Sequence, residues 1–340
     1  MCAPPEARNT KLTGIPMSPH RGGAGVGAIR AAFYRNVWPS LLLLGTALAA
    51  EPLAAEATAE CQNTKCGGVD IPYPFGLYST GCAMAPGFVV HCNDTGNGVL
   101  KPFLGTVDLL SIDVQLAQAR VRNHISYACY NFSSNKMNFY RWWMKLGSPF
   151  TFSDTANLFT VIGCRMLAYI ADEVNVGSYM SGCVSVCRRG ELTGVIDGVC
   201  SGKGCCQTTI PKGLDYYQAI WEESMNTSGI FYKTPCSYAV LMEASNFTFS
   251  TTYLTSPLEF NNSYGGQAPV VLDWAIQTAN NCMEAKKNLT SYACKSDNSM
   301  CINSTNGLGY ICNCSQGYQG NPYIQGPNGC QGELSFTPQS

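Results

Sequence analysis

Alternation of apolar and polar residues is the main structural signal along the chain. Between Leu110 and Leu116 apolar residues occupy every second position, which is the pattern of a strand with one buried face. The alternation ends near Gln118, because Arg120 and Arg122 share the parity of the apolar positions and would point into the core. We therefore expect a bulge or a new strand at this point.

Other apolar runs favour a mainly β fold. Three segments, beginning at Phe150, Asn157 and Met166, are rich in β-branched and aromatic residues and are predicted to be strands. The stretch LDYYQAIWEE, which begins at Leu214, is instead predicted to form one short helix. Because Trp142 and Trp143 are adjacent, they cannot both face inward from one strand, so one of them is expected to be exposed.

The stretch CGGVDIPYPFG, residues 66–76, cannot form a helix, because Pro72 and Pro74 fix φ and remove two backbone donors. We expect a stiff extended segment or a sheet edge. Its aromatic residues Tyr73 and Phe75 are candidates for stacking on a sugar ring, although aromatics in such surroundings more often belong to the core.

Composition indicates a secreted protein. The 340 residues include 19 cysteines but only 13% charged residues. Residues 1–50 form a leader with the basic and apolar regions of a signal peptide, and residues 51–60 a spacer. No other apolar run is long enough for a membrane helix, so a soluble product is expected. Removal of Cys2 with the leader leaves eighteen cysteines, an even number that indicates complete pairing.

Eight sequons follow the leader and none lies within it, which agrees with passage through the secretory pathway. Each predicts an N-glycosylated loop that faces solvent. They lie at Asn93, Asn131, Asn226, Asn246, Asn261, Asn288, Asn303 and Asn313.

The cysteines divide the chain into three parts. Small cysteine-rich β domains are expected at 61–130 and 131–275, followed by a cysteine module at 282–330 and a tail at 331–340. The six cysteines of the module are separated by eleven, six, ten, one and fifteen residues. Spacing alone leaves fifteen possible connectivities open.

The single-residue gap in this module, together with GYICNCSQGYQGNPY from Gly309, resembles an epidermal-growth-factor-like module. The resemblance implies three disulfides, Cys282–Cys301, Cys294–Cys312 and Cys314–Cys330. Calcium-binding modules of this type need acidic ligands before the first cysteine. Here TANN precedes Cys282, so no tight calcium site is expected.

With CGGVDIPYPFG, FTVIGCRMLAYIA from Phe159 and GCCQTTIPKGLDYY from Gly204, the chain resembles the extracellular region of plant wall-associated receptor kinases. This implies a galacturonan-binding domain in the first block and an ectodomain that binds pectin at the cell wall. The family's membrane helix and kinase signature are missing from the sequence. We expect a secreted or wall-located ectodomain, or one at the plasma membrane if the chain is part of a receptor.

A polyanion such as pectin calls for spaced cations. Residues 61–170 carry eight Lys and Arg against five Asp and Glu, whereas residues 171–340 carry eight against thirteen. Arg120 and Arg122 are the first candidates for binding the polysaccharide. Lys101, Arg141 and Lys145 are the second. For any one of them, a solvated charge or a partner for Asp108 or Asp113 is an equally good interpretation.

Catalysis is not expected. Only His91 and His124 follow the leader, and neither belongs to a metalloprotease or hydrolase motif. The cysteines between Cys183 and Cys206 favour disulfides over zinc, and no metal, cofactor or nucleic acid partner is predicted. The alternative function from another class is a protein-interaction module or decoy that binds a receptor or peptide, through the epidermal-growth-factor-like part.

Overall fold

The computed structural model describes residues 64–78, 81–171, 179–188, 191–222 and 229–332, all within one compact unit that begins at Leu53. The predicted leader, the spacer and most of the tail lie outside the described residues, as do Cys61 and Asn226. Within the described ranges no helix is long and apolar enough to cross a bilayer.

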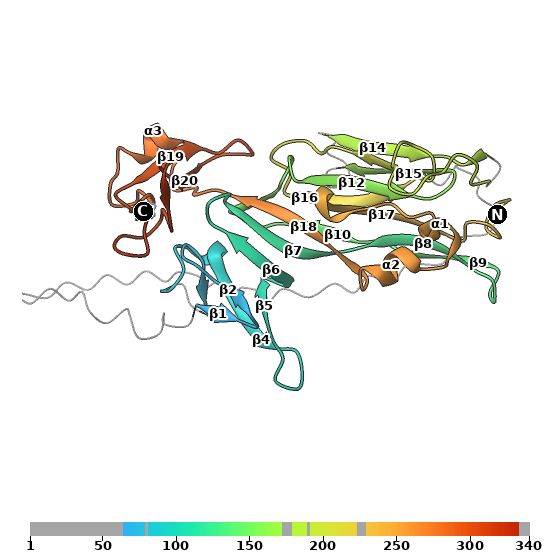
Figure 1. Ribbon diagram of the computed structural model, residues 1–340, viewed down its shortest axis with the longest axis horizontal. Helices are drawn as coiled ribbons and strands as arrows, with labels where there is room; N and C mark the ends of the chain where they lie inside the picture. Colours follow the sequence, from blue (N-terminus) through green and yellow to red (C-terminus); the bar gives the residue numbers. More distant parts are fainter. Residues whose placement is uncertain (1–63, 79–80, 172–178, 189–190, 223–228, 333–340) are drawn as a thin grey trace, which may run out of the picture. The chain divides into compact units, whose positions relative to one another are not determined.

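The largest sheet has seven strands in the order β11-β18-β7-β6-β5-β4-β3 (Figure 1). Strands β3 and β4 pair in parallel, and the other neighbours pair antiparallel. The strands are β3 (Gly76–Leu77), β4 (Val89–Asp94), β5 (Leu100–Leu104), β6 (Val107–Asp113), β7 (Gln118–His124), β11 (Phe150–Phe152) and β18 (Gln267–Trp274). A 3₁₀ turn at Pro86–Phe88 leads into β4.

Two further sheets have the orders β15-β12-β17-β8-β9 and β10-β16-β13-β14. The five-stranded sheet contains β8 (Ser126–Asn131), β9 (Lys136–Tyr140), β12 (Asn157–Ile162), β15 (Cys205–Thr208) and β17 (Cys236–Glu243). The four-stranded sheet contains β10 (Trp143–Lys145), β13 (Met166–Ala171), β14 (Met180–Ser185) and β16 (Tyr216–Trp221). The short elements are β1 (Lys65–Cys66), β2 (Val69–Asp70), a 3₁₀ turn (Ala244–Asn246), α1 (Thr252–Thr255) and α2 (Glu259–Ser263).

Strands from the two predicted β domains share sheets. Strand β7 of the first block pairs along its whole length with β18 of the second, and β8 pairs with β17. The boundary placed at residue 130 therefore separates two sequence patterns and not two folded bodies. The physical reason is that antiparallel pairing joins strands that are far apart in the chain, which a local pattern does not reveal.

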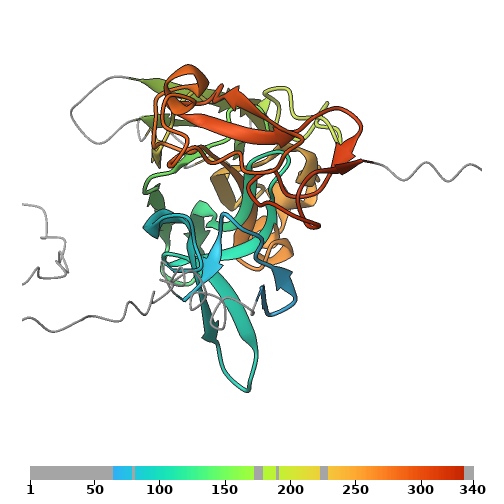
Figure 2. The ribbon, with the colours of Figure 1, turned by 90° about the vertical axis from the view of Figure 1, so that its left-hand side faces the viewer.

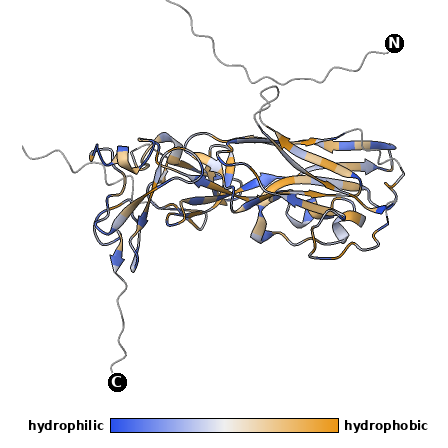
Figure 3. Ribbon diagram, turned by 90° about the horizontal axis from the view of Figure 1, so that it is seen from above, coloured by the Kyte–Doolittle hydropathy of each residue, from blue (hydrophilic) through white to orange (hydrophobic). Residues whose placement is uncertain are grey.

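Strands β7, β13 and β16 follow the alternation expected of sheets with one buried face, whereas β17 is buried at every position. Figure 3 shows hydrophobic and hydrophilic residues along the same strands. The three strands predicted from Phe150, Asn157 and Met166 are β11, β12 and β13. The helix predicted from Leu214 is wrong, because this segment forms β16. Its buried residues are Tyr217, Ala219 and Trp221, which alternate with period two between the neighbours β10 and β13.

The break in alternation before Arg120 has two causes. The face predicted to be buried between Leu110 and Leu116 is wrong, because β6 ends at Asp113, Leu109 is its buried residue, and Leu116 is exposed. The pairing register with β7 shifts between Leu109 and Ser111, as at a bulge, and this shift changes which residues face the core. A turn then ends β6, and a new strand begins at Gln118 with Ala119 and Val121 facing the core. Arg120 and Arg122 consequently lie on the opposite, half-exposed face of β7, as expected.

The IPYPFG stretch is a turn rather than an extended rod, and its last residue begins β3, the edge strand of the large sheet, in agreement with the expected sheet edge. The peptide bond between Tyr73 and Pro74 is cis, and the Phe75 N–H donates to the Pro72 carbonyl at 3.0 Å, which is the arrangement of a turn with cis-proline at its third position. The chain enters β3 directly afterwards, with Phe75 directed into the core.

Every cysteine within the described residues is disulfide-bonded, which excludes the zinc interpretation of the Cys183 to Cys206 run. Outside the last module the pairs are Cys66–Cys92, Cys129–Cys236, Cys164–Cys187, Cys183–Cys206 and Cys200–Cys205, and Cys82 is bonded as well. Closing loops of this size stabilises a fold by roughly 2–4 kcal/mol each.

Residues 282–330 form the epidermal-growth-factor-like module, shown in orange and red from a second direction in Figure 2. It contains α3 (Cys282–Ala285), the hairpin β19 (Ser299–Asn303) and β20 (Tyr310–Cys314), and β21 (Tyr318–Gln319). Strand β21 pairs with β22 (Gln331–Gly332), directly after the module. Its disulfides join Cys282 to Cys301, Cys294 to Cys312 and Cys314 to Cys330. These are the three pairs that the resemblance implies.

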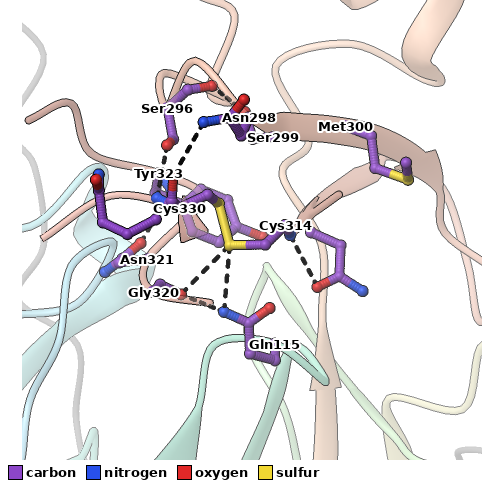
Figure 4. Close-up of a disulfide and its surroundings, with 12 residues drawn as sticks. Gln115, Ser296, Asn298, Ser299, Met300, Cys314, Gly320, Asn321, Tyr323 and Cys330 are labelled. Carbon is purple, nitrogen blue, oxygen red and sulfur yellow. Dashed lines mark hydrogen bonds between the residues drawn. A yellow bond between two sulfur atoms is a disulfide. The ribbon is translucent and has the colours of Figure 1, made fainter. Parts of the chain in front are cut away.

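The module is hydrogen-bonded to the large sheet. Figure 4 shows the Gln115 side chain, from the turn between β6 and β7, directed at the Cys314–Cys330 disulfide and at the Gly320 carbonyl, to which its amide donates. The Asn321 amide donates to the Tyr73 carbonyl at 2.6 Å. The two regions therefore meet through specific polar contacts.

Candidate functional site

Two adjoining hollows lie where β10 passes the large sheet. The first, called the cationic hollow here, has a volume of about 430 Å³. It is lined by Thr106, Val107, Asp108, Arg122, His124, Trp142, Trp143, Met144, Lys145 and Gln267. These residues come from β6, β7, β10 and β18 and from the residues next to them, so the hollow exists only where these strands meet.

Arg122 provides the guanidinium of the cationic hollow. It lies on the half-exposed face of β7, and its side chain is 42% exposed. The nearest anion is Asp108, whose carboxylate lies 4.0 Å from Arg122 Nε and 3.7 Å from Lys101 Nζ. One carboxylate thus faces two cations, which leaves positive charge available for an anionic ligand.

His124 continues the same face of β7. Its ring lies 4.3 Å from that of Trp142, and its Nε2 lies 2.9 Å from the amide nitrogen of Gln267, its cross-strand partner. Burial lowers the pKa of His124, and the negative charge of Asp108 opposes this shift. Protonation of this imidazole would add a cation to the hollow.

Trp142 and Trp143 differ in their exposure to solvent, as expected. Trp142 is partly buried, and its indole N–H donates to Asn123 Oδ1 at 3.0 Å, whereas Trp143 is 56% exposed on β10. Two residues along β10, the Lys145 ammonium lies 3.3 Å from the Asp215 carboxylate and 5.9 Å from the centre of the Tyr216 ring. An exposed indole beside cations suits a ligand that has both flat apolar faces and negative charge.

The second hollow, called the apolar hollow here, has a volume of about 390 Å³. It is lined by Pro86, Gly87, Val89, His91, Leu104, Gly105, Thr106, Val107, Val121, Lys145, Leu146, Gly147, Ser148, Phe150 and Leu272. It shares Thr106, Val107 and Lys145 with the cationic hollow, so one extended ligand could occupy both.

The predicted polysaccharide-binding residues are only partly brought together. Arg122 and Lys145 line the cationic hollow, and Lys101 reaches it through Asp108. Arg141 lines neither hollow, and its guanidinium lies 5.4 Å from the centre of the Phe139 ring.

Arg120 lies on the same face of β7 as Arg122 but has a structural partner. Its Nε and Nη2 both lie 2.9 Å from Oε1 of Glu243, whose side chain is only 7% exposed. A buried carboxylate needs such a partner. The position of Arg120 thus favours a role in holding β17 beside β7.

Phe75 is not available to a ligand, which corrects its place among the stacking candidates. It is 1% exposed and lies in edge-to-face contact with Phe88 and Trp274. Core packing of aromatics explains this position. Tyr73 is partly buried against the same core, and burial raises its pKa. Neither residue lines either hollow.

Sequence reasoning did not select His124, Gln267 or Thr106. His124 could have been found, because it has the same parity as Arg120 and Arg122 along one strand. Gln267 could not, because it is placed opposite His124 only by the long-range pairing of β18 with β7.

The predicted glycosylation sites differ in exposure. Asn93, Asn246, Asn288 and Asn303 are exposed, and Asn131, Asn261 and Asn313 are partly buried. Their glycosylation stays a prediction. No group of three or more His, Cys, Asp or Glu side chains that could hold a metal ion occurs in the part of the chain that the structure describes.

Comparison with known proteins relates the sequence of this chain to a family. Residues 61–123 match the family described as "Wall-associated receptor kinase galacturonan-binding", and residues 197–283 match "Wall-associated kinase". Wall-associated receptor kinase 2 of Arabidopsis thaliana is 35% identical over 275 residues, which cover 80% of this chain and 34% of that protein. Over the ectodomain region, this chain is homologous to the wall-associated receptor kinases.

Other wall-associated receptor kinases of Arabidopsis thaliana are similar to the same degree. Wall-associated receptor kinase 4 is 33% identical over 78% of this chain, and wall-associated receptor kinase 5 is 32% identical over 82% of it. The chain spans about a third of the length of the curated relatives it matches, 34% or 35% in each case. No solved structure gives a significant match.

The galacturonan-binding match contributes four lining residues of the cationic hollow, Thr106, Val107, Asp108 and Arg122. Gln267 falls in the second match. The tryptophans and Lys145 lie between the two matched ranges.

Proposed function

We propose that this chain binds an acidic cell-wall polysaccharide of the galacturonan type in the cationic hollow. The observation that carries the proposal is the meeting of Arg122, His124 and Lys145 with the exposed ring of Trp143 in one open hollow. The galacturonan-binding match over residues 61–123 supports the same ligand class.

The chemistry of the ligand fits these side chains. A galacturonan presents one carboxylate on each ring, which a guanidinium can bind in a bidentate, charge-assisted manner. The C–H faces of the sugar rings are apolar and can stack on Trp143, while Lys145 supplies a second charge two residues along β10. Asp108 orients Arg122, but its single negative charge does not neutralise both Arg122 and Lys101.

We propose that this binding is noncatalytic and takes place outside the cell, as part of wall sensing. The homologous ectodomains and the galacturonan-binding match support binding rather than turnover.

The test is binding of oligogalacturonides to the purified glycoprotein at two ionic strengths. Raising the salt from about 0.01 M to about 0.15 M shortens the Debye length from about 30 Å to about 8 Å, so binding through several cations must weaken markedly. Arg122→Gln removes the charge and keeps most of the side chain. Loss of one charge-assisted contact should weaken binding about tenfold or more.

Lys136→Gln is the matched control, because Lys136 is exposed on β9 and lines neither hollow. It makes the same change in net charge and should leave the affinity unchanged. Equal losses in Arg122→Gln and Lys136→Gln would show that net charge and not the hollow binds the ligand. Absence of binding to the unmodified protein at low salt would refute the proposal.

A second candidate is a protein partner for the epidermal-growth-factor-like module. Met300 and Ile302 are exposed on one face of β19, which pairs on one side with β20. An exposed apolar strand of this kind suits a protein interface. Binding of a protein through this strand should depend little on salt, in contrast to binding of a polyanion.

A further inference from the structure

The four-stranded sheet is apolar on both of its faces. Its inner face is buried, with residues such as Ala168 and Tyr217 in the core. The opposite face, called the outward face here, consists of the residues of β10, β13, β14 and β16 that alternate with the buried ones, and each of these is partly or fully exposed. Its large apolar residues include Trp143, Tyr169, Met180, Val184, Tyr216 and Ile220.

The outward face carries almost no charge. The four strands together contain one charged residue, Lys145, at the end of β10. The solvent side of an antiparallel sheet is normally polar, and an edge strand such as β14 is normally protected by charged residues. Strand β14 instead leaves Met180 71% and Val184 44% exposed. An exposed face of this composition indicates a binding surface.

Three aromatic side chains are spread across the outward face. Trp143 and Tyr216 come from the paired strands β10 and β16, and their ring centres are 6.2 Å apart. Tyr169 lies on β13, two strands from β10 and two residues further along than the row that contains Trp143 and Gln218. With strands about 4.8 Å apart and a rise of about 3.4 Å per residue, Tyr169 and Trp143 lie roughly 12 Å from each other.

Gly182 keeps the β14 side of this face flat. It lies directly opposite Tyr169, and a Cβ at this position would come within 2.5 Å of the Tyr169 Cβ. Glycine therefore leaves the space that the tyrosine side chain needs on the sheet. Gln218, whose Oε1 lies 3.4 Å from the Tyr216 hydroxyl, adds an amide that can form hydrogen bonds to hydroxyl groups. The face thus combines a flat apolar surface with a few uncharged polar groups.

The size and charge of the outward face decide what can bind there. Three of its strands are six residues long, so the four strands cover roughly 400 Å². This is only about half of the ~800 Å² that each partner contributes to a stable protein interface. A polyanion would find Lys145 as the single cation in these strands. A narrow, flat and uncharged ligand fits better, and a glycan chain has this form, since its rings present C–H faces and hydroxyl edges.

We propose that the outward face of the four-stranded sheet binds an uncharged, extended polysaccharide of the β-linked glucan class by stacking on Tyr169, Trp143 and Tyr216. The substituents of such rings are equatorial, so both ring faces are C–H surfaces that suit aromatic side chains. This inference goes beyond the proposed function, because its ligand is neutral and Tyr169 does not line the cationic hollow. Trp143 and Lys145 belong to both surfaces, so one protein molecule can hold an acidic and a neutral polymer side by side.

The experiment is titration calorimetry of the purified glycoprotein with cellohexaose, an uncharged β-linked glucose oligomer. Stacking on a neutral ligand does not depend on counterions, so the affinity should be the same at about 0.01 M and about 0.15 M salt. Tyr169→Ala should weaken binding about tenfold, because it removes one aromatic side chain that the ligand would bury. Tyr232→Ala is the matched control. Tyr232 is 69% exposed in the turn before β17, outside the four-stranded sheet, and its loss should leave the affinity unchanged.

Two more variants separate this surface from the cationic hollow and from effects on folding. Gln218→Ala truncates a partly exposed polar side chain and leaves the core intact, so it tests the face even if Tyr169→Ala does not fold. Loss of one hydrogen bond to the sugar should weaken cellohexaose binding about fivefold. Arg122→Gln should leave cellohexaose binding unchanged and weaken binding of oligogalacturonide, whereas Tyr169→Ala should have the reverse effects.

Each outcome decides for or against the proposal. Salt-independent binding of cellohexaose that is weakened in Tyr169→Ala and Gln218→Ala and retained in Arg122→Gln supports it. Absence of cellohexaose binding to the unmodified protein refutes it and leaves the proposed function standing if oligogalacturonides bind. Equal affinities of the unmodified protein, Tyr169→Ala and Gln218→Ala also refute it, because the glucan then binds elsewhere. A dimer in analytical ultracentrifugation that dissociates in Met180→Glu would refute it too, because a second copy would then cover the face.

Discussion

Asn306 is one of the residues that hold the epidermal-growth-factor-like module on the large sheet, and its replacement by alanine should weaken the docking of the module. The residue is 5% exposed. Its amide nitrogen donates to the Phe152 carbonyl at 2.9 Å and to Asp273 Oδ2 at 2.8 Å, and its Oδ1 accepts the Gly213 N–H at 2.6 Å. One side chain of the module thus forms hydrogen bonds to β11, to β18 and to the segment before β16.

The expected loss of docking free energy follows from the hydrogen bonds that alanine cannot form. Each of the three hydrogen bonds contributes about 1 kcal/mol net. The carbonyl of Phe152, whose residue is fully buried, would also lose this partner, which costs roughly 1–3 kcal/mol more. Water can reach Gly213, which is exposed, so its N–H adds little. The expected loss is about 4 kcal/mol of docking free energy.

The disulfides do not compensate for this loss, because the three disulfides of the module are internal to it. The assay is hydrogen exchange of β19 and β20 together with limited proteolysis near residues 276–281, where β18 continues into the module. A loss of about 4 kcal/mol should speed exchange through module opening by roughly 10³-fold.

Asn298→Ala is the matched control. Asn298 makes its side-chain hydrogen bond inside the module, to the Cys330 carbonyl at 3.2 Å, so this variant removes an asparagine without touching the docking surface. It should leave proteolysis near residues 276–281 unchanged. Unchanged exchange and proteolysis in Asn306→Ala would refute the reasoning, because the module would then be held by other contacts.

Two further predictions concern β7. Arg120→Ala should lower the melting temperature clearly more than Arg122→Ala, because it leaves the buried Glu243 carboxylate without its ion pair. Adding Glu243→Gln to Arg120→Ala should restore part of the lost stability. Equal melting temperatures for the two single variants would contradict this role of Arg120. Binding of oligogalacturonide should tighten as the pH falls below 6.5, the ordinary pKa of histidine, because burial lowers the pKa of His124 and its protonation adds a cation near the ligand. Titration calorimetry of His124→Gln should show a smaller pH dependence.

Local patterns predicted much of the fold. Their content of β-branched and aromatic residues located the strands at Phe150, Asn157 and Met166, because these side chains pack well on the buried face of a sheet. The helix predicted from Leu214 was wrong, because a short amphipathic stretch with aromatic residues fits both the helical period and the strand period. This segment is a strand because β16 pairs with a neighbour on each side. The break before Arg120 was correctly placed, because inward-facing charges are costly in any fold.

Partners that are distant in sequence could not be predicted. Glu243 lies 123 residues from Arg120, so no local pattern shows that this arginine is already paired. In the same way, nothing near Arg122 in the sequence shows that Trp143 and Lys145 will lie beside it. The candidate site was predicted as a set of cations in one block, whereas the structure selects the subset that faces a common hollow.

The composition of the cationic hollow shows which part of the protein must fold before a ligand can bind. Its lining comes from the galacturonan-binding match, from the interval after it and, through Gln267, from the second match. Strand β7 carries Arg122 and His124, but β18 fixes their positions by pairing with β7 along its whole length. β10 in turn is held by pairing with β16. The candidate site therefore depends on strands from several sheets, and the first block alone supplies only part of its lining.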